Sequence, residues 1–298
     1  MTTRPDTDGS VARADRLARA LHEGLPVSER RLDLAGVSTS LLEGGDGPPV
    51  ILLHGLGMFA EMWGGVIPHL VASHRIVAPD LPGQGRSEVR AGTRLDAPAM
   101  VAWLGELIAQ TCSEPPTLVG ASLGGSFAAH FGVEHSDRVR RIVLVASGSI
   151  GPFRPAAPGA LLALARYMWR PSPSGFDRFF RYALHDPERV FTSTGNWPPA
   201  WRTYHIDRTK QRSVRRANAQ LLRRIGIRQI RAERLGKISG PVALIWGRND
   251  RIMRFRIAER ASARFGWRLY PIDNCGHYTY EQFDAFLDAL RAAMDEGG

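Results

Sequence analysis

Ser122 lies in the pattern Gly120-Ala-Ser122-Leu-Gly124, which joins an apolar run to a stretch of small residues. The apolar run 117–119 is typical of a buried strand, and the residues after 125 are typical of a helix start. Glycines two positions before and after the serine keep side chains out of the sharp turn between them. Such a turn holds the hydroxyl at the end of a sheet. Because the chain is rich in glycine, partner residues must be found before the pattern indicates chemistry.

A serine hydroxyl is a weak nucleophile at neutral pH and needs a base, which in turn needs a group that fixes its tautomer. His277 follows the apolar run 268–272 in a loop before the last helix, and Asp250 directly follows the apolar run 242–246. Ligands of open α/β sheets collect at the carboxyl ends of strands. We therefore predict that Ser122 is the nucleophile, His277 the general base and Asp250 the orienting acid.

Acyl transfer also requires two fixed N–H donors for the oxyanion. The amide of Leu123 follows the serine at a helix start, and the amide of Leu56 lies in the loop His54-Gly-Leu-Gly57 after the apolar run 50–53. We predict these two amides as the oxyanion hole. His54 is expected to organise this loop, with a contact to the substrate as the alternative role.

The predicted elements alternate between strand and helix for most of the chain. Strands are expected at 31–34, 37–42, 50–53, 75–78, 117–119, 141–145, 241–246 and 268–272, and the first two form a hairpin. Helices are expected at 59–72, 96–111, after 125, and at 255–265 and 280–294. Strands separated by helices predict an α/β fold with one open, parallel sheet and helices on both of its faces.

One segment interrupts this alternation. Residues 151–240 contain eight prolines, no apolar strand and several helix-like pieces rich in large apolar residues. We predict a helical cap here, inserted into an α/β core made of residues 30–150 and 241–298. Residues 1–29 form an N-terminal extension with a helix over 11–23.

The ordered set of motifs resembles the α/β-hydrolase superfamily from about residue 30 to 295. The motifs are His54-Gly-Leu-Gly57, Asp80-Leu-Pro-Gly-Gln-Gly-Arg-Ser87, Gly120-Ala-Ser122-Leu-Gly124-Gly125, Trp246-Gly-Arg-Asn-Asp250 and Gly276-His277. The resemblance implies a mostly parallel eight-stranded sheet, a helical cap after the sixth strand, and the chain order Ser, Asp, His for the catalytic residues. Ala121 departs from the histidine or asparagine of many members, which leaves the substrate subgroup open.

The predicted function is hydrolysis of a carboxylic ester with a small to medium apolar or aromatic acyl group. Carbon–carbon bond hydrolases of ring-fission products and non-hydrolytic lyases or tailoring enzymes keep the same residues and are the alternatives. A ligand-binding or nucleic-acid-binding protein without activity is a third. Large apolar cap residues are candidates for the substrate pocket: Met168, Trp169, Phe176, Phe179, Phe180, Trp197, Trp201 and Tyr204. Of these, we predict Met168, Trp169, Phe180 and Trp201, together with His54, as substrate contacts.

The amino-acid composition limits the kinds of partner that we expect for this protein. The net charge is +10, and residues 151–240 carry 18 basic and 5 acidic side chains. Because 37 of the 39 basic residues are arginine, this balance is typical of a GC-rich genome, with a functional role of the basic segment as the alternative. We expect a small-molecule substrate rather than nucleic acid. Cys112 and Cys275 are too few for a disulfide framework and are typical of a reducing cytoplasm. No membrane span, metal or cofactor is predicted, and a monomer or homodimer is expected.

Overall fold

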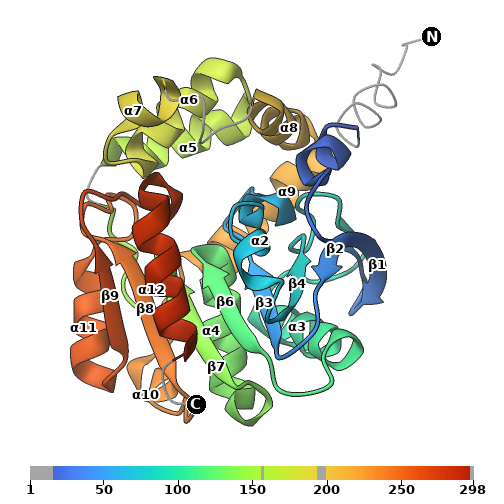
Figure 1. Ribbon diagram of the computed structural model, residues 1–298. Helices are drawn as coiled ribbons and strands as arrows, with labels where there is room; N and C mark the ends of the chain where they lie inside the picture. Colours follow the sequence, from blue (N-terminus) through green and yellow to red (C-terminus); the bar gives the residue numbers. More distant parts are fainter. Residues whose placement is uncertain (1–15, 156–157, 193–198, 296–298) are drawn as a thin grey trace.

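The computed structural model describes residues 16–155, 158–192 and 199–295 and contains one sheet (Figure 1). Within these residues the sheet has nine strands, of which eight follow the order β1-β2-β4-β3-β6-β7-β8-β9 and the two-residue β5 pairs with β2. The strands are β1 (Ser28–Leu34), β2 (Val37–Gly44), β3 (Pro49–Leu53), β4 (Arg75–Pro79), β5 (Glu88–Val89), β6 (Thr117–Ala121), β7 (Arg141–Val145), β8 (Val242–Gly247) and β9 (Arg268–Ile272).

Six strands, from β4 to β9 along this order, are parallel to one another, whereas β1 and β2 form an antiparallel hairpin. The hairpin turns at Ala35 and Gly36, which both adopt positive φ angles. Every residue of β3, β6, β7 and β8 is buried, as expected of parallel strands covered on both faces. The predicted α/β fold with a mostly parallel sheet is confirmed; β5 was not predicted because two residues carry no periodic signal.

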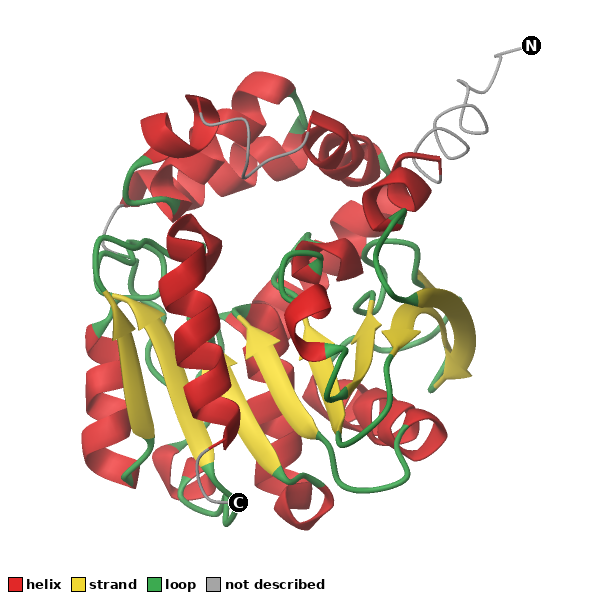
Figure 2. Cartoon of the chain, viewed as in Figure 1, coloured by secondary structure: helices red, strands yellow, loops and turns green. Residues whose placement is uncertain are grey.

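Helices cover both faces of the sheet (Figure 2). The helices of the core are η1 (Ala60–Trp63), α2 (Ile67–Leu70), α3 (Ala97–Thr111), α4 (Leu123–His135), η2 (Ser136–Arg138), α11 (Arg256–Phe265), η4 (Thr279–Gln282) and α12 (Phe283–Asp295). One apolar cluster joins α3, α4 and α11 to one face of the sheet, and a second joins η1, α2 and α12 to the other. The helix predicted over 59–72 is interrupted between η1 and α2, where Gly64 and Gly65 follow each other.

Between β7 and β8 the chain leaves the sheet and forms further helices. They are α5 (Pro158–Trp169), α6 (Pro173–Ala183), α7 (Pro187–Thr192), α8 (Pro199–Lys210), α9 (Arg212–Leu221), η3 (Leu222–Gly226) and α10 (Ala232–Leu235). Figure 1 shows α5 to α8 arching over the carboxyl ends of the strands. From here on, the cap means the described part of this arch, residues 158–192 and 199–210, which is shorter than the predicted cap of residues 151–240. The helix-like pieces predicted in this segment correspond to these helices, and α8, α9 and η3 follow one another closely along the chain.

Aromatic rings hold the cap to the core. Trp201 and Tyr204 of α8 pack against Phe59, which precedes η1, with ring centroids 5.0 and 4.5 Å apart. The segment after the cap returns to the core, since Leu221 and Leu235 belong to the same apolar cluster as α4. The boundary of the cap at residue 240 stays a prediction, because the helices after 211 pack on the core.

Within the described ranges, no helix combines the length and apolar character that crossing a bilayer requires. Cys112 is half-buried, Cys275 is buried, and both are free thiols.

His205 gives the cap a pH-dependent stability. Burial lowers the pKa of this side chain to about 3, and its Nδ1 lies 2.7 Å from the hydroxyl of Tyr167. The unfolded chain binds a proton at His205 below about pH 6.5, but the folded chain does not, so the free energy of unfolding falls as the pH falls. We expect this group to lower it by about 2 kcal/mol between pH 7.5 and 5.0.

Urea denaturation at both pH values measures this effect. His205→Gln is expected to reduce the pH dependence, whereas His69→Gln, at an exposed position, leaves it as in the wild type. An unchanged pH dependence in His205→Gln would contradict the assignment.

Candidate active site

Ser122 lies at the turn between β6 and α4 and has a strained backbone, with φ 50° and ψ −107°. A non-glycine residue with positive φ is uncommon and persists only where its surroundings fix it. The amide of Ser122 donates a 2.8 Å hydrogen bond to the carbonyl of Val145, and its carbonyl accepts one of 3.1 Å from the amide of Gly148. The end of β7 therefore holds the turn on both sides of the serine.

Glycines let three backbone segments approach this turn. A Cβ on Gly120 would lie 2.5 Å from the carbonyl oxygen of Gly124, and a Cβ on Gly124 would collide with the carbonyl group of Leu53. The amide of Gly124 instead donates a 3.1 Å hydrogen bond to the carbonyl of His54. The predicted role of these glycines, to keep side chains out of the turn, follows from these contacts.

The structure brings the three predicted side chains together. The Oγ atom of Ser122 lies 3.1 Å from Nε2 of His277, and Nδ1 of His277 lies 2.8 Å from Oδ2 of Asp250. A carboxylate accepts but does not donate, so Nδ1 of the imidazole carries the proton and Nε2 accepts from the serine hydroxyl. The side chain of Asp250 is fully buried, and that of His277 is 15% exposed.

The loops after β8 and β9 fix the acid and the histidine. The amides of Ile252 and Met253 each donate a 2.8 Å hydrogen bond to Oδ1 of Asp250, which leaves Oδ2 for the imidazole. The amide of Asn249 donates to the carbonyl of Cys275 over 2.9 Å and joins the two loops. The carboxylate is thus oriented before any substrate arrives.

Glu281 was not predicted, yet it supports the histidine loop. It is 2% exposed, and its Oε2 accepts hydrogen bonds of 2.9 Å from the amide of Gly276 and 2.8 Å from the amide of His185. His185 follows α6 in the cap, so one buried carboxylate ties the loop of His277 to the cap. The sequence carries no signal for this role, because Glu281 lies at the start of a helix in a stretch that resembles an exposed segment.

Leu56 and Leu123, the two residues predicted to supply the oxyanion donors, line the same cavity as Ser122. Among the hydrogen bonds of the described residues, none is donated by either amide. The loop of Leu56 is held by its neighbour Gly57, whose amide donates a 2.8 Å hydrogen bond to Oε1 of the buried Gln84. Both residues therefore lie beside Ser122 with amides that have no partner within the described residues.

His54 does not reach the cavity. It is fully buried, its Nδ1 donates to the carbonyl of Gly55 over 2.8 Å, and its Nε2 accepts from the amide of Leu81 over 2.9 Å. Burial lowers the pKa of the imidazole, which is therefore neutral at physiological pH. These bonds assign His54 to the support of the loop and correct its prediction as a substrate contact.

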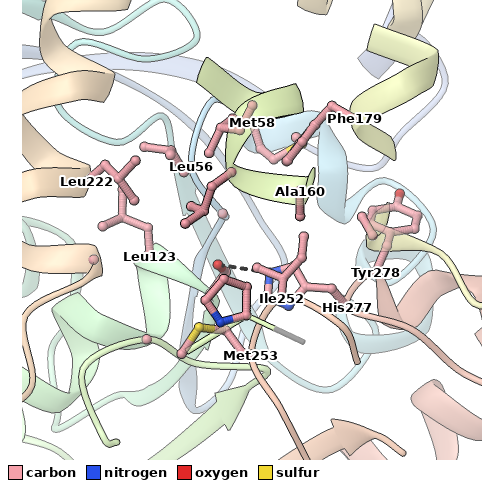
Figure 3. A pocket seen from close by; sticks show the side chains of 18 of the residues that line it. Leu56, Met58, Leu123, Ala160, Phe179, Leu222, Ile252, Met253, His277 and Tyr278 are labelled. Carbon is pink, nitrogen blue, oxygen red and sulfur yellow. Dashed lines mark hydrogen bonds between the residues drawn. The ribbon is translucent and has the colours of Figure 1, made fainter. Parts of the chain in front are cut away.

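Ser122 and His277 open into an apolar cavity between the core and the cap (Figure 3). Figure 3 shows Leu123 and Leu222 on one side of the cavity and Tyr278 on the opposite side. The lining residues are Gly55, Leu56, Met58, Met62, Ser122, Leu123, Gly148, Phe153, Pro155, Ala160, Leu161, Leu164, Phe179, Phe180, Ala183, Leu222, Gly226, Ile252, Met253, His277 and Tyr278. None of these described residues is Asp, Glu, Lys or Arg. Burial raises the pKa of Tyr278, so its hydroxyl is also neutral.

The structure places the predicted substrate contacts of the cap in different surroundings. Phe180 lines the cavity. Trp201 is 5% exposed and packs against Phe59 and His205, so it belongs to the aromatic core of the cap instead. Trp169 is 77% exposed, and Met168 is not among the lining residues, which corrects both predictions. Trp197 lies outside the described residues.

Several lining residues could have been found from their sequence neighbours. Met58, Met253 and Tyr278 lie within three residues of the predicted Leu56, Asp250 and His277. Helical spacing could not select Phe179 over Trp169, because both lie in amphipathic cap segments whose rotation depends on tertiary packing. In the part of the chain that the structure describes, no group of three or more His, Cys, Asp or Glu side chains is arranged to hold a metal ion.

The sequence matches the model of a family described as "Alpha/beta hydrolase family" over residues 50–289. The chain belongs to this family. Together with the relatives below, this membership identifies the protein as a hydrolase, and its α/β-hydrolase fold is the one described above.

Curated relatives of this hydrolase include esterases. A pimeloyl-[acyl-carrier protein] methyl ester esterase of Nitrosomonas europaea is 30% identical over 259 residues, which cover 83% of this chain and 96% of the relative. The enzyme of the same name from Aeromonas hydrophila is 35% identical over 123 residues, or 41% of this chain. That second match spans 47% of the relative, so this chain aligns with about half of its length.

Solved structures of similar fold include esterases and carbon–carbon bond hydrolases. A carboxylesterase of Bacillus subtilis superposes on this hydrolase with a TM-score of 0.82 at 19% identity, covering 97% of this chain and all of the other. The 2-hydroxy-6-oxo-6-phenylhexa-2,4-dienoate hydrolase of Rhodococcus sp. strain RHA1 has a TM-score of 0.76 at 25% identity and covers 90% of this chain and 98% of the other. Both likenesses show that this hydrolase shares its fold with these proteins.

The packing around Ser122 predicts a large effect of one methyl group. In Gly124→Ala the new Cβ collides with the backbone of Leu53, so we expect a loss of about 2 kcal/mol of stability or more and a displaced serine. Gly105→Ala in α3 is the matched control, since its Cβ would meet side-chain atoms no closer than 3.4 Å. Thermal denaturation and ester turnover measure both variants; a stable, active Gly124→Ala would contradict the steric argument.

Proposed function

We propose that this protein is a serine hydrolase that cleaves neutral carboxylic esters through a triad of Ser122, His277 and Asp250. The observation that carries the proposal is the chain of two hydrogen bonds, 3.1 and 2.8 Å long, that links the serine hydroxyl to the buried carboxylate. Nucleophile, base and orienting acid have the mutual geometry that activates a serine.

Acylation begins when Nε2 of His277 accepts the proton of the Ser122 hydroxyl as Oγ attacks the ester carbonyl. The imidazolium that forms is stabilised by Asp250, whose position is fixed by two backbone amides. The developing oxyanion accepts hydrogen bonds from the amides of Leu56 and Leu123. Because these donors have no other partner in the described residues, they need no rearrangement when the charge develops.

Acylation ends when His277 donates this proton to the departing alcohol and the C–O bond to the alcohol breaks, which leaves the acyl group on Oγ. In deacylation, Nε2 accepts a proton from a water molecule as the water oxygen attacks the acyl carbonyl. The bond between the acyl carbon and Oγ then breaks, His277 returns the proton to Oγ, and the carboxylic acid leaves.

The cavity supports an apolar acyl group as the part of the substrate that binds next to Ser122. Its walls are Leu, Met, Ile, Phe, Ala, Pro and Gly residues around the polar side chains of Ser122, His277 and Tyr278. None of Arg202, Arg208 and Arg212 lines the cavity, and Arg202 pairs with Asp177 at 2.7 Å. Burying a charged acyl group here would therefore be unfavourable.

This absence of charge favours an ester over a ring-fission product. The Rhodococcus hydrolase acts on a dienoate, which carries a carboxylate. A carboxylate that enters this cavity would meet no Lys or Arg among the described lining residues. The Nitrosomonas relative is named for a methyl ester, a neutral group. Hydrolysis of a neutral ester thus agrees better with the cavity than cleavage of a carbon–carbon bond.

Substitution in the triad tests the mechanism. Ser122→Ala should remove p-nitrophenyl butyrate hydrolysis, because Ser122 is the one Ser, Thr or Cys among the described residues that line the cavity. Asp250→Asn should lower kcat by about 10³ to 10⁴-fold, since an amide no longer holds the productive tautomer. Steady-state kinetics measures both, and Ser126→Ala on α4 is the control, since Ser126 is not among the cavity residues. Substantial turnover by Ser122→Ala would exclude the serine mechanism.

A pair of substrates tests the neutral cavity. p-Nitrophenyl butyrate and the p-nitrophenyl monoester of succinic acid share the leaving group and differ by a terminal carboxylate. We expect kcat/KM to be at least about tenfold lower for the charged ester, because its carboxylate must be desolvated without a cationic partner. Comparable values for the two esters would contradict the assignment of the cavity to neutral acyl groups.

A further inference from the structure

A second groove, which we call the arginine groove, lies on the flank of the core and contains five arginines. Arg154 comes from the loop after β7, Arg254 from the loop before α11, and Arg256, Arg260 and Arg264 from α11 itself. The helix α10 forms the opposite wall, and the floor is apolar, with Ile257, Ala261 and Phe265 among its residues. None of the described lining residues is acidic.

The spacing along α11 aligns three of these arginines. Arg256, Arg260 and Arg264 are separated by four residues each, so they lie on one side of the helix about 6 Å apart and span about 12 Å. Figure 1 shows α11 at the edge of the molecule next to β9. The row is therefore open to a ligand from solvent.

These arginines have few counter-charges. Among the described residues, the carboxylate recorded within salt-bridge distance of the five is that of Glu233, 3.8 Å from Arg264, and both side chains of that pair are more than half exposed. Arg254 donates to the carbonyl of Pro155 over 3.2 Å. Glu259, also on α11, is exposed but does not line the groove. Few carboxylates thus offset the mutual repulsion of the arginines in the groove.

Several exposed arginines outside the groove pair with a carboxylate. Arg90 contacts Asp33 at 2.8 Å, and Arg94 contacts Asp96 at 2.6 Å. A row of guanidinium groups with few carboxylates nearby instead attracts anions, and the planar guanidinium matches the oxygens of a phosphate group in a bidentate manner. The length of the row exceeds one phosphate, and the apolar floor suits an organic body that joins several.

Two loops separate the groove from the cavity beside Ser122 and His277, which we call the catalytic cavity, and each loop lines both. In the loop after β7, Phe153 and Pro155 line the catalytic cavity while Arg154 lines the groove. In the loop before α11, Met253 lines the cavity while Arg254 lines the groove. The hydrogen bond from Arg254 to Pro155 joins the two walls. A ligand in the groove would therefore lie one residue layer from the bound acyl group.

We propose that the arginine groove binds the phosphate groups of an organic ligand that carries at least two of them, beside the catalytic cavity. Such phosphates can belong to the leaving group of the ester or thioester substrate, or to a separate molecule that binds next to it. Both sources present the same chemistry to the arginines.

Direct binding tests the groove independently of catalysis. Isothermal titration calorimetry with inorganic tripolyphosphate and with coenzyme A is expected to show binding that weakens as salt increases. In Arg256→Gln/Arg260→Gln the affinity should fall by about tenfold or more. Arg19→Gln/Arg140→Gln removes the same two charges at exposed positions outside the groove and should retain the affinity within about twofold. Cooperative thermal denaturation of both variants shows that they are folded.

Two results would overturn the proposal. One is the absence of binding to the wild type at low salt, and the other is an equal loss of affinity in both double variants, which would indicate general electrostatic attraction.

A second measurement distinguishes the two sources of phosphate, and it rests on the proposed function. Butyryl-coenzyme A and S-butyryl-N-acetylcysteamine share the thioester, but only the first carries phosphates. A groove for the leaving group gives a higher kcat/KM for the first substrate, and Arg256→Gln/Arg260→Gln removes that advantage. A groove for a separate ligand gives equal values while calorimetric binding persists. If neither thioester is hydrolysed, the catalytic proposal does not extend to thioesters, and calorimetry alone decides about the groove.

Discussion

Three backbone segments meet around Ser122 with no side chain between them: the end of β6, the start of α4 and the loop that follows β3. Glycine at 120 and 124 permits this approach, and the hydrogen bond from the amide of Gly124 to His54 secures it. The same contact fixes a serine with positive φ beside a cavity that Leu56 and Leu123 also line. The position of Ser122 relative to these two residues therefore follows from one packing constraint, which side chains at positions 120 and 124 would remove.

Burial explains which parts of the fold could be predicted. Continuous apolar runs such as 50–53 and 141–145 indicate strands covered on both faces, and their carboxyl ends predict where Ser122, Asp250 and His277 meet. The sequence gives no comparable signal for β5, for the interruption at Gly64 and Gly65, or for the rotation of the cap helices. These depend on contacts between distant residues, such as the packing of Trp201 on Phe59. The wall of the cavity was accordingly predicted less well than its chemistry.

Charge is distributed unevenly around the site. The chain carries an excess of arginine, yet no described residue that lines the cavity beside Ser122 is an arginine, and Arg202 of the cap is paired with Asp177. Five arginines lie instead in the groove beyond the loops that enclose the cavity, where Glu233 lies within salt-bridge distance of Arg264. In the proposed mechanism, an apolar compartment for the reacting carbonyl strengthens the hydrogen bonds that the oxyanion accepts, because the local dielectric is low. Keeping cations outside this compartment preserves that effect.

The two strands that precede and follow the cap segment are neighbours in the sheet. Strand β7 pairs with β8 from Ile142 opposite Val242 to Val145 opposite Ile245. Almost one hundred residues of chain therefore enter and leave at adjacent strands, and the register of the sheet does not depend on what lies between them. This arrangement allows the cap and the core to evolve at different rates. Substrate selectivity can change by insertion, deletion or exchange of cap helices, while the core that positions the reactive groups stays the same. For protein engineering, the same junction offers a place at which caps of related hydrolases can be exchanged as cassettes.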